Sequence, residues 1–343
     1  MLSELSSEYS VRPARLDDVE AVCALCNAWS KRMHGFASHD PNEERVDWQV
    51  PGFDLETDTR VVCDACGSPI AFASVWDVTS PHVSIGSYYR VHPDHDDPRL
   101  EEALLDWLKS RARRAVKRAP ADARVIVRHY AFDRDDRRRR LLLHRGYRRV
   151  RQYVRLRIEM SGPPLPAEIP QGIEIRPFDP KADLHATILS VRETFRDHWG
   201  HIERDLEEDT RMWTHWVEED RDFDPSVWHL ACDGNEIVGV SLGTTKRPES
   251  DNLAYIYTLG VRRAWRGRGI AHALLRHSFA AFYERGRSVV DLDADAENLT
   301  GAMRLYEGVG MHVVWRNNEY EKELRSGIDL ALRSLEKEEE HAR

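Results

Sequence analysis

The chain has 343 residues, of which 41% are hydrophobic, enough to build two domains with separate cores. Its formal net charge of −9 gives no overall positive field that would favour nucleic acid or an anionic membrane. No apolar run reaches the roughly 18 residues of a membrane span, and the first residues, MLSELSSEYS, show neither a basic leader nor the apolar stretch of a signal peptide. We therefore expect a cytoplasmic protein, a monomer or weak homodimer, that binds neither nucleic acid nor membrane.

Two CxxC pairs, Cys23/Cys26 and Cys63/Cys66, raise the question of a zinc site, which needs four converging ligands. The first pair falls in the apolar helical pattern VEAVCALCNAW, whereas Cys63 ends the strand RVVC and Cys66 falls in the turn that follows. The chain has five cysteines, an odd number that fits reduced thiols better than a disulfide framework. We expect packing roles for these cysteines and no metal.

The segment EMSGPPLPAEIPQG, residues 159–172, is rich in proline and predicts a semi-rigid linker. Similar stretches lie on its two sides, for example VRPARLDDVEAV and IRPFDPKADLHATI. We therefore predict an α/β (α+β) fold of two tandem domains, each a mixed, largely antiparallel sheet flanked by helices. The predicted boundaries are 1–158 for a first domain, 173–325 for a second, and 326–343 for a charged helical tail.

In the second half the pattern predicts a mixed order of strands and helices. The expected elements, in chain order, are the strand IEIRP, helices near 182–196 and 204–219, the strands VWHLACD, EIVGVSLGTT and AYIYTLGV, a helix from about 269 to 285, the strand SVVDLDAD, the helix LTGAMRLYEGV, and the strand pair HVVWR and EYEKEL.

The turn RGRGIA stands between the strand AYIYTLG and an apolar helix. Gly267 and Gly269 let the backbone turn, and the free amides at the helix start favour an anion. Arg266 and Arg268 suit phosphate oxygens, so a pyrophosphate is the expected guest, although a purely structural turn would also need glycine. A dinucleotide-binding GxGxxG would need a small residue at His272, and a P-loop would need GK followed by Ser or Thr.

Two spaced patterns carry a resemblance to a known family. Arg-x-x-Gly-x-Ala is formed by Arg266, Gly269 and Ala271, and Asn-x-x-x-Ala-x-x-Leu-Tyr-x-x-x-Gly runs over residues 298–310. With these patterns the chain resembles the GCN5-related N-acetyltransferase (GNAT) superfamily, in its tandem-domain branch that includes mycothiol synthase. The resemblance covers residues 173–325 strongly and the first half only in outline.

The resemblance implies that acetyl-CoA is the co-substrate. The end of the strand would pair with the pantetheine arm as an added strand, and the loop amides with their arginines would hold the pyrophosphate. Asn298 resembles the asparagine that hydrogen-bonds pantetheine in the family, although an asparagine ahead of a helix is also an ordinary N-cap. The residues implied for cofactor binding are Leu259, Gly260, Val261, Arg266, Gly267, Arg268, Gly269, Ile270, Ala271 and Asn298.

In the family a tyrosine at the place of Tyr306 donates a proton to the coenzyme A sulfur, whereas the alternative for this residue is a buried core tyrosine. The base is open, because the run from Tyr255 to Thr258 has no acid where many relatives carry Glu. The candidates for substrate contact are Asp197, His198, Trp199 and Tyr257, with Asp293 and Asp295 as weaker ones. His198 is equally compatible with a structural role.

The first half lacks these features. Its loop VHPDHDDPRLEEALL places Asp94, Asp96 and Asp97 where phosphate would be repelled, and Leu142 stands where a proton donor would be needed. We expect a degenerate domain that scaffolds the second, walls the acceptor cleft or keeps a non-catalytic ligand. Its arginine-rich run DRDDRRRRLLLHRGYRRVRQYVRLR is interspersed with acids and favours a solvated face over nucleic acid.

The favoured function is an acetyl-CoA-dependent N-acetyltransferase that moves the acetyl group to the primary amine of a small molecule by direct attack in a ternary complex. The alternative is a non-catalytic acyl-CoA sensor or a protein-interaction module, motivated by the missing strand carboxylate. An antibiotic amine, an amino acid or a polyamine all remain open as acceptors, and an acidic cleft would favour cationic ones.

Overall fold

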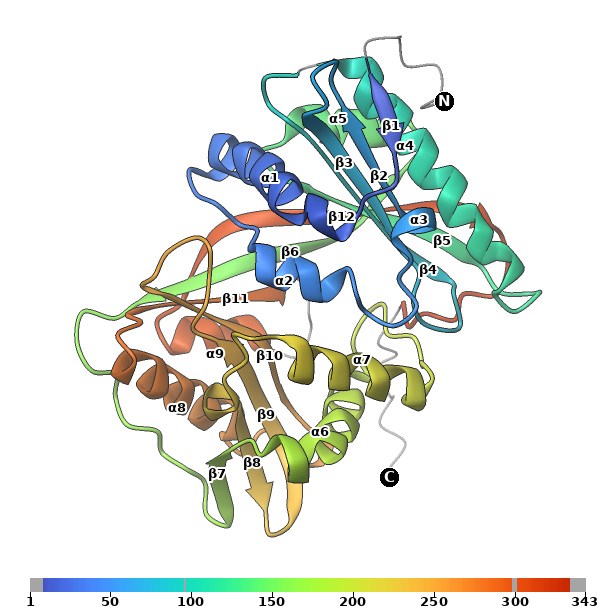
Figure 1. The fold of residues 1–343 in the computed structure, drawn as a ribbon. Helices are drawn as coiled ribbons and strands as arrows, with labels where there is room; N and C mark the ends of the chain where they lie inside the picture. Colours follow the sequence, from blue (N-terminus) through green and yellow to red (C-terminus); the bar gives the residue numbers. More distant parts are fainter. Residues whose placement is uncertain (1–8, 96, 298–300, 334–343) are drawn as a thin grey trace.

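The computed structural model describes residues 9–95, 97–297 and 301–333. Two halves with the same order of elements lie one above the other, joined along a single sheet (Figure 1). None of the helices in the described residues has the length and hydrophobicity needed to cross a bilayer.

The first half has the mixed order of helices and strands that the duplicated pattern predicts. Its elements are β1 (Ser10–Arg12), α1 (Val19–His34), α2 (Pro41–Asp47), α3 (Leu55–Asp58), β2 (Thr59–Cys63), β3 (Pro69–Trp76), β4 (Ser84–Val91), α4 (Pro98–Ala112), β5 (Val125–Phe132), α5 (Asp136–His144) and β6 (Arg148–Glu159). Cys23 and Cys26 are buried on α1 and Cys63 is buried at the end of β2, whereas Cys66 is exposed in the turn after it.

The second half repeats this order without a counterpart of the short helix α3. Its elements are β7 (Ile173–Pro177), α6 (Pro180–Phe195), α7 (Leu206–Glu219), β8 (His229–Asp233), β9 (Glu236–Thr244), β10 (Leu253–Val261), α8 (Ile270–Glu284), β11 (Val289–Asp295), α9 (Ala302–Gly308) and β12 (His312–Arg325). Of the predicted linker, residues 159–172, Glu159 ends β6 and residues 160–172 contain no helix or strand.

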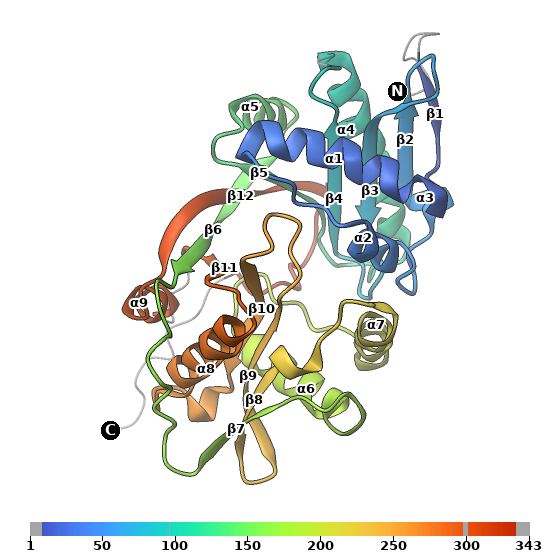
Figure 2. The same cartoon turned by 60° about the vertical axis from the view of Figure 1, so that its left-hand side comes forward.

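The two halves exchange their last strands. The sheet order is β1-β2-β3-β4-β5-β12-β6-β11-β10-β9-β8-β7, so β6 lies beside β11 of the second half and β12 lies beside β5 of the first. Figure 2 shows β6 and β12 running between the halves. Burial follows the exchange, because Val154 and Leu156 of β6 enter the core of the second half and Tyr320 of β12 enters that of the first.

Charges reinforce this exchange on β6, within the arginine-rich run. Arg155 lies opposite Asp293 and Arg157 opposite Asp291 in the register of β6 with β11. The guanidinium Nε of Arg157 donates to Asp291 at 2.8 Å, and Nη2 of Arg155 donates to Asp293 at 2.9 Å. Opposite charges directly across a sheet stabilise the pairing, so these arginines hold the two halves together.

Two expectations were wrong. HVVWR and EYEKEL, predicted as a strand pair, form the single strand β12. Of the predicted helical tail, residues 326–333 contain no helix, and residues 334–343 lie outside the described part of the chain. Instead of forming helical bonds, Leu332 exchanges backbone hydrogen bonds with Gly200 and His201, at 2.6 and 2.9 Å.

The predicted boundary at residue 158 falls inside β6, which pairs with β12 and β11 and enters the core of the second half. The domain boundaries therefore remain a prediction. The described residues form one continuous sheet, with the exchanged strands β12 and β6 at its centre.

Candidate functional site

The strands β10 and β11 separate halfway along their length. Their parallel pairing runs from Leu253↔Val289 to Ile256↔Leu292 and ends there. The pairing of β10 with β9 shifts register between Ile256 and Thr258, which marks a bulge at Tyr257. Beyond the bulge β10 stays paired to β9 alone, so backbone groups on its β11 side face an opening and are available to a ligand.

A cavity of about 590 Å³ fills this opening. One wall comes from the end of β10, the other from the end of β11, and the floor from the loop before α8 and from α9. The structure brings most of the predicted residues together here: Tyr257, Leu259, Gly260, Val261, Arg266, Gly267, Gly269, Ile270, Ala271, Tyr306 and His198 all line it. Arg268, Asp197 and Trp199 do not line it, and Asn298 lies outside the described residues.

The glycine loop makes an anion site at the start of α8. Gly267 and Gly269 have φ of +76° and +84°, a left-handed backbone that side-chain-bearing residues rarely adopt. Gly269 is the N-cap of α8, and no side chain caps this helix. The first-turn amides therefore remain available at the positive end of the helix dipole.

The first half closes the matching position. The Asp97 side chain accepts from the Arg99 amide at 2.9 Å and caps α4. Leu142, which stands where the second half has Tyr306, is fully buried in the first core. Both observations agree with a first half that lacks the anion site and the hydroxyl.

Arg266 is fixed beneath the loop. Its Nε donates to the Val261 carbonyl at 3.0 Å, and its Nη2 donates to the Thr194 carbonyl at 2.8 Å and to Asp197 at 3.0 Å. The Asp197 carboxylate also accepts from Nη1, and this pairing holds the pKa of Asp197 below its usual value against the opposing effect of burial. Asp197, predicted as a substrate contact, thus lies against Arg266.

Close packing of α6 on β10 explains one glycine of the site. A Cβ atom on Gly260 would lie 2.2 Å from Cγ2 of Thr194 on α6. No carbon–carbon contact is that short, so only glycine allows α6 to approach the strand at this point. The same approach brings Phe195 and His198 to the cavity wall.

Tyr306 projects from α9 into the apolar core beside the cavity. It is 8% exposed, and burial raises the pKa of its phenol to about 12. The hydroxyl is therefore protonated at neutral pH and keeps a proton to donate.

The other predicted contacts divide between cavity and surface. His198 packs its ring on Phe195 with centroids 4.6 Å apart, and burial lowers its pKa. Trp199 contacts the guanidinium groups of Arg151 and Arg333, which lie 5.0 and 4.6 Å from its ring centroid, and it does not line the cavity. Tyr257 is half exposed at the bulge, with its ring against Tyr255.

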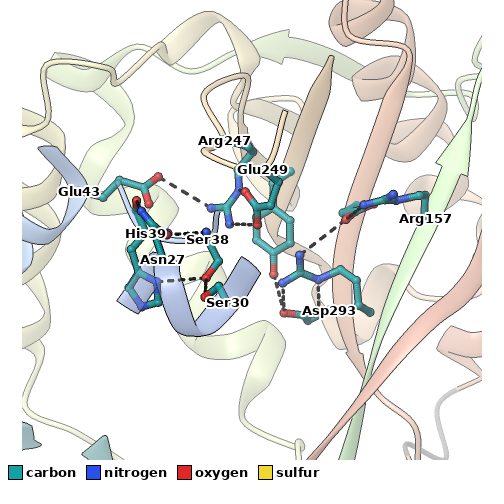
Figure 3. Close-up of polar contacts among 12 residues, drawn as sticks. Asn27, Ser30, Ser38, His39, Glu43, Arg157, Arg247, Glu249 and Asp293 are labelled. Carbon is teal, nitrogen blue, oxygen red and sulfur yellow. Dashed lines mark hydrogen bonds and ion pairs between the residues drawn. The ribbon is translucent and has the colours of Figure 1, made fainter. Parts of the chain in front are cut away.

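The candidate acids of β11 are already engaged. Asp293 accepts from the Tyr255 hydroxyl at 2.9 Å and from Arg155, and Asp295 accepts from Arg151 at 2.7 Å. Figure 3 shows Asp293 in this network, with Glu43 at the opposite end of the polar side chains drawn and Arg247 between the two. Within the described residues, no three His, Cys, Asp or Glu side chains are placed to hold a metal ion together.

Sequence reasoning missed two further cavities, both formed between the halves. One, of about 430 Å³, lies between residues 76–84 and the helices α6 and α7; the other, of about 350 Å³, lies between α2, α7 and β9. Both share Tyr257 and Thr258 with the first cavity, so all three meet at the bulge. The tryptophans of α7 were a signal for a lined cavity, but nothing local in the sequence places α2 opposite them.

Comparisons with known proteins agree with this geometry. A family model described as "Acetyltransferase (GNAT) family" matches residues 188–311. The GCN5-related N-acetyltransferase from Sphaerobacter thermophilus, known from its crystal structure, is 34% identical and superposes with a TM-score of 0.76 over 95% of this chain and 98% of its own. A tandem GNAT protein from the clavulanic acid biosynthesis pathway shares the fold, with a TM-score of 0.67 over 93% of this chain and all of its own at 12% identity.

Among curated sequences, mycothiol acetyltransferase of Thermobispora bispora is 31% identical over 169 residues. The matched region is 48% of this chain and 55% of that protein, so the chain spans about half the length of this relative.

Proposed function

Because the chain belongs to the GCN5-related N-acetyltransferase family, we propose that it transfers the acetyl group of acetyl-CoA to the primary amine of a small molecule, by direct attack in a ternary complex. The observation that carries the proposal is the opening between β10 and β11, which leads to the uncapped start of α8. The pantetheine arm of coenzyme A needs the unpaired edge of β10, and its pyrophosphate needs the uncapped start of α8.

Each residue then has a defined part. The backbone of Leu259 to Val261 pairs with the pantetheine arm, and one amide near the bulge faces the thioester oxygen, where negative charge develops. The amides from Gly267 to Ala271 hold the pyrophosphate. Arg266 positions the loop through its bonds to the Val261 and Thr194 carbonyls.

Tyr306 is the proposed acid for the departing thiolate. Holding donor and amine together supplies much of the rate, and a phenol donor supplies the proton that the sulfur needs. The amine must lose its own proton, and a water in the cavity is its proposed first acceptor, because Asp293 and Asp295 are already in ion pairs.

The test is release of coenzyme A thiol over a panel of amines with acetyl, propionyl and succinyl donors. Tyr306→Phe should lower kcat by about a hundredfold, in the range typical of a lost general acid, and leave coenzyme A binding unchanged. Tyr283→Phe on α8, outside the cavity, is the matched control. Full turnover by Tyr306→Phe at all pH values would remove the acid, and binding of acetyl-CoA with no turnover on any amine would favour the sensor.

A further inference from the structure

The cavity of about 350 Å³ between α2, α7 and β9 has two kinds of lining side chains. Aromatic rings come from Trp213, Trp216, Phe223, Trp228 and Tyr257. Carboxylates come from Glu43, Asp47, Asp220, Asp222 and Asp224. Among the described residues that line it there is no lysine, arginine or histidine.

Both halves of the chain build this cavity. The Trp216 indole donates to Asp47 at 3.1 Å, His215 contacts the Val46 carbonyl at 2.8 Å, and the Asn42 amide donates to Asp220 at 2.9 Å. These contacts join α2 to α7 at the cavity, and they fix the spacing between the two helices.

Three of the carboxylates have cations nearby. Glu43 lies 3.8 Å from Arg247, as Figure 3 shows, and burial raises the pKa of Glu43 to about 7. Asp222 lies 3.5 Å from Lys246, and Asp224 lies 3.8 Å from Arg285.

The other two carboxylates have neutral partners. Asp47 accepts from the Trp216 indole and Asp220 from the Asn42 amide, and no lysine or arginine of the described chain forms an ion pair with either. Burial raises the pKa of Asp47 to about 6, so its carboxyl is mostly ionised at neutral pH and the cavity keeps negative charge beside aromatic faces.

This combination suits a positively charged alkylammonium group. Aromatic faces attract cations through their quadrupole, and carboxylates add a Coulomb attraction that aromatic rings strengthen by excluding water. The edge-to-face packing of Trp213 and Phe223 on Trp228, with centroids 5.9 and 4.9 Å apart, fixes these rings in place. A carboxylate or phosphate would be repelled.

The cavity also reaches the proposed site of acetyl transfer. Tyr257 and Thr258 line both this cavity and the cavity between β10 and β11. The two cavities therefore adjoin at the bulge, where an acceptor that uses both would have to pass.

The cavity on the other side of Trp213 is lined by both charges, Arg128, Arg192 and Arg204 together with Asp77 and Asp209. Arg192 pairs with Asp209 and Glu203, and Asp77 pairs with Arg118. Both carboxylates of this cavity therefore have an arginine partner, unlike Asp47 and Asp220.

We propose that the cavity between α2 and α7 is an acceptor subsite that binds a second, positively charged ammonium group, so the acceptor is a diamine, a polyamine or another amine with a remote cationic centre. The inference rests on the proposed acetyltransferase function and specifies the substrate class of that site.

Matched acceptors test it. Linear α,ω-diamines of three to six carbons are compared with amino alcohols and ω-amino acids of the same length, and kcat/KM is measured by thiol release. The diamines should exceed the amino alcohols by about tenfold at the best length, equivalent to one modest ionic contact. Equal rates for diamines and amino alcohols, or a preference for amino acids, would overturn the subsite while leaving the acetyltransferase function intact.

A variant pair assigns the effect to the cavity. Asp220→Asn keeps an oxygen that accepts from Asn42 and removes the charge, so the advantage of diamines over amino alcohols should fall by about tenfold. Glu219→Gln, one residue earlier on the exposed face of α7, should leave that ratio unchanged. An unchanged ratio in Asp220→Asn would contradict the assignment.

A binding measurement makes the two proposals separable. A trimethylalkylammonium ion cannot be acetylated, but it should quench tryptophan fluorescence saturably in the intact protein, with at least fivefold weaker binding to Asp220→Asn. Such binding without any transfer to amines would leave the subsite standing and remove the enzyme function. Absence of saturable quenching up to millimolar probe would overturn the subsite.

Discussion

The Asp197 carboxylate accepts hydrogen bonds from both terminal nitrogens of Arg266 and so links the end of α6 to the glycine loop. We predict that Asp197→Asn weakens coenzyme A binding by about tenfold, because the loop loses a charge-assisted bond that orients it. Calorimetric titration with coenzyme A measures this effect. Glu284→Gln, at the exposed far end of α8, is the control and should leave binding unchanged. Equal affinities of Asp197→Asn and the unaltered protein would show that the pair is dispensable.

The contact between Gly260 and Thr194 predicts a rescue. Gly260→Ala should destabilise the fold by about 2 kcal/mol, because its Cβ would collide with Cγ2 of Thr194 and push α6 outward. Thr194→Ser removes that methyl group, so the double variant should recover most of the loss. Urea unfolding of the four proteins forms a double-mutant cycle. Additive losses would mean that strain elsewhere on β10 explains the glycine.

Buried His229 predicts an acid-sensitive stability. Burial lowers its pKa from 6.5 to about 3, and its ring is 2% exposed beside Ser278. Between these pH values the unfolded chain binds a proton that the folded chain does not, so stability falls as pH falls. From pH 7 to pH 5 this histidine should account for about 2 kcal/mol of the loss.

Denaturant unfolding at the two pH values checks this loss. His229→Asn should remove that part of the pH dependence, whereas His185→Asn, at an exposed position on α6, should retain it. An unchanged pH slope in His229→Asn would disprove the account.

The strand exchange predicts that neither half folds independently. A chain ending at residue 311 loses β12, which leaves β5 without its neighbour and the first core without Tyr320. It should show no cooperative unfolding transition by circular dichroism, whereas a chain ending at residue 333 should unfold cooperatively. Adding a peptide of residues 312–333 to the shorter chain should restore part of the transition. A stable, cooperative shorter chain would contradict the structural importance of the exchange.

Local sequence signals predicted much of the second half. Apolar periodicity placed α8 and β10 within one or two residues, and the glycines of RGRGIA correctly marked a turn before a helix. The spacing of the motif also brought Gly269 and Tyr306 to one cavity, as the resemblance implied.

Long-range pairing was beyond such signals. The tail was predicted helical from its charge pattern. In residues 326–333, however, Leu332 forms backbone hydrogen bonds with Gly200 and His201, and no local periodicity predicts these contacts. Asp197 was predicted to contact the substrate. Its pairing with Arg266 depends on the packing of α6 on β10, which the sequence alone does not reveal. The acidic cavity depends on α2 and α7, which are far apart in the sequence and meet only in the assembled fold.

The exchanged strands also set an order on biosynthesis. β12 comes after all the other strands in the sequence. It nevertheless pairs with the edge of β5, a strand of the first half. While the ribosome makes the intervening residues, that edge remains open to pairing with neighbouring nascent chains. The sheet of the amino-terminal half therefore gains its central neighbour to β5 only after residues 312–325 have been made.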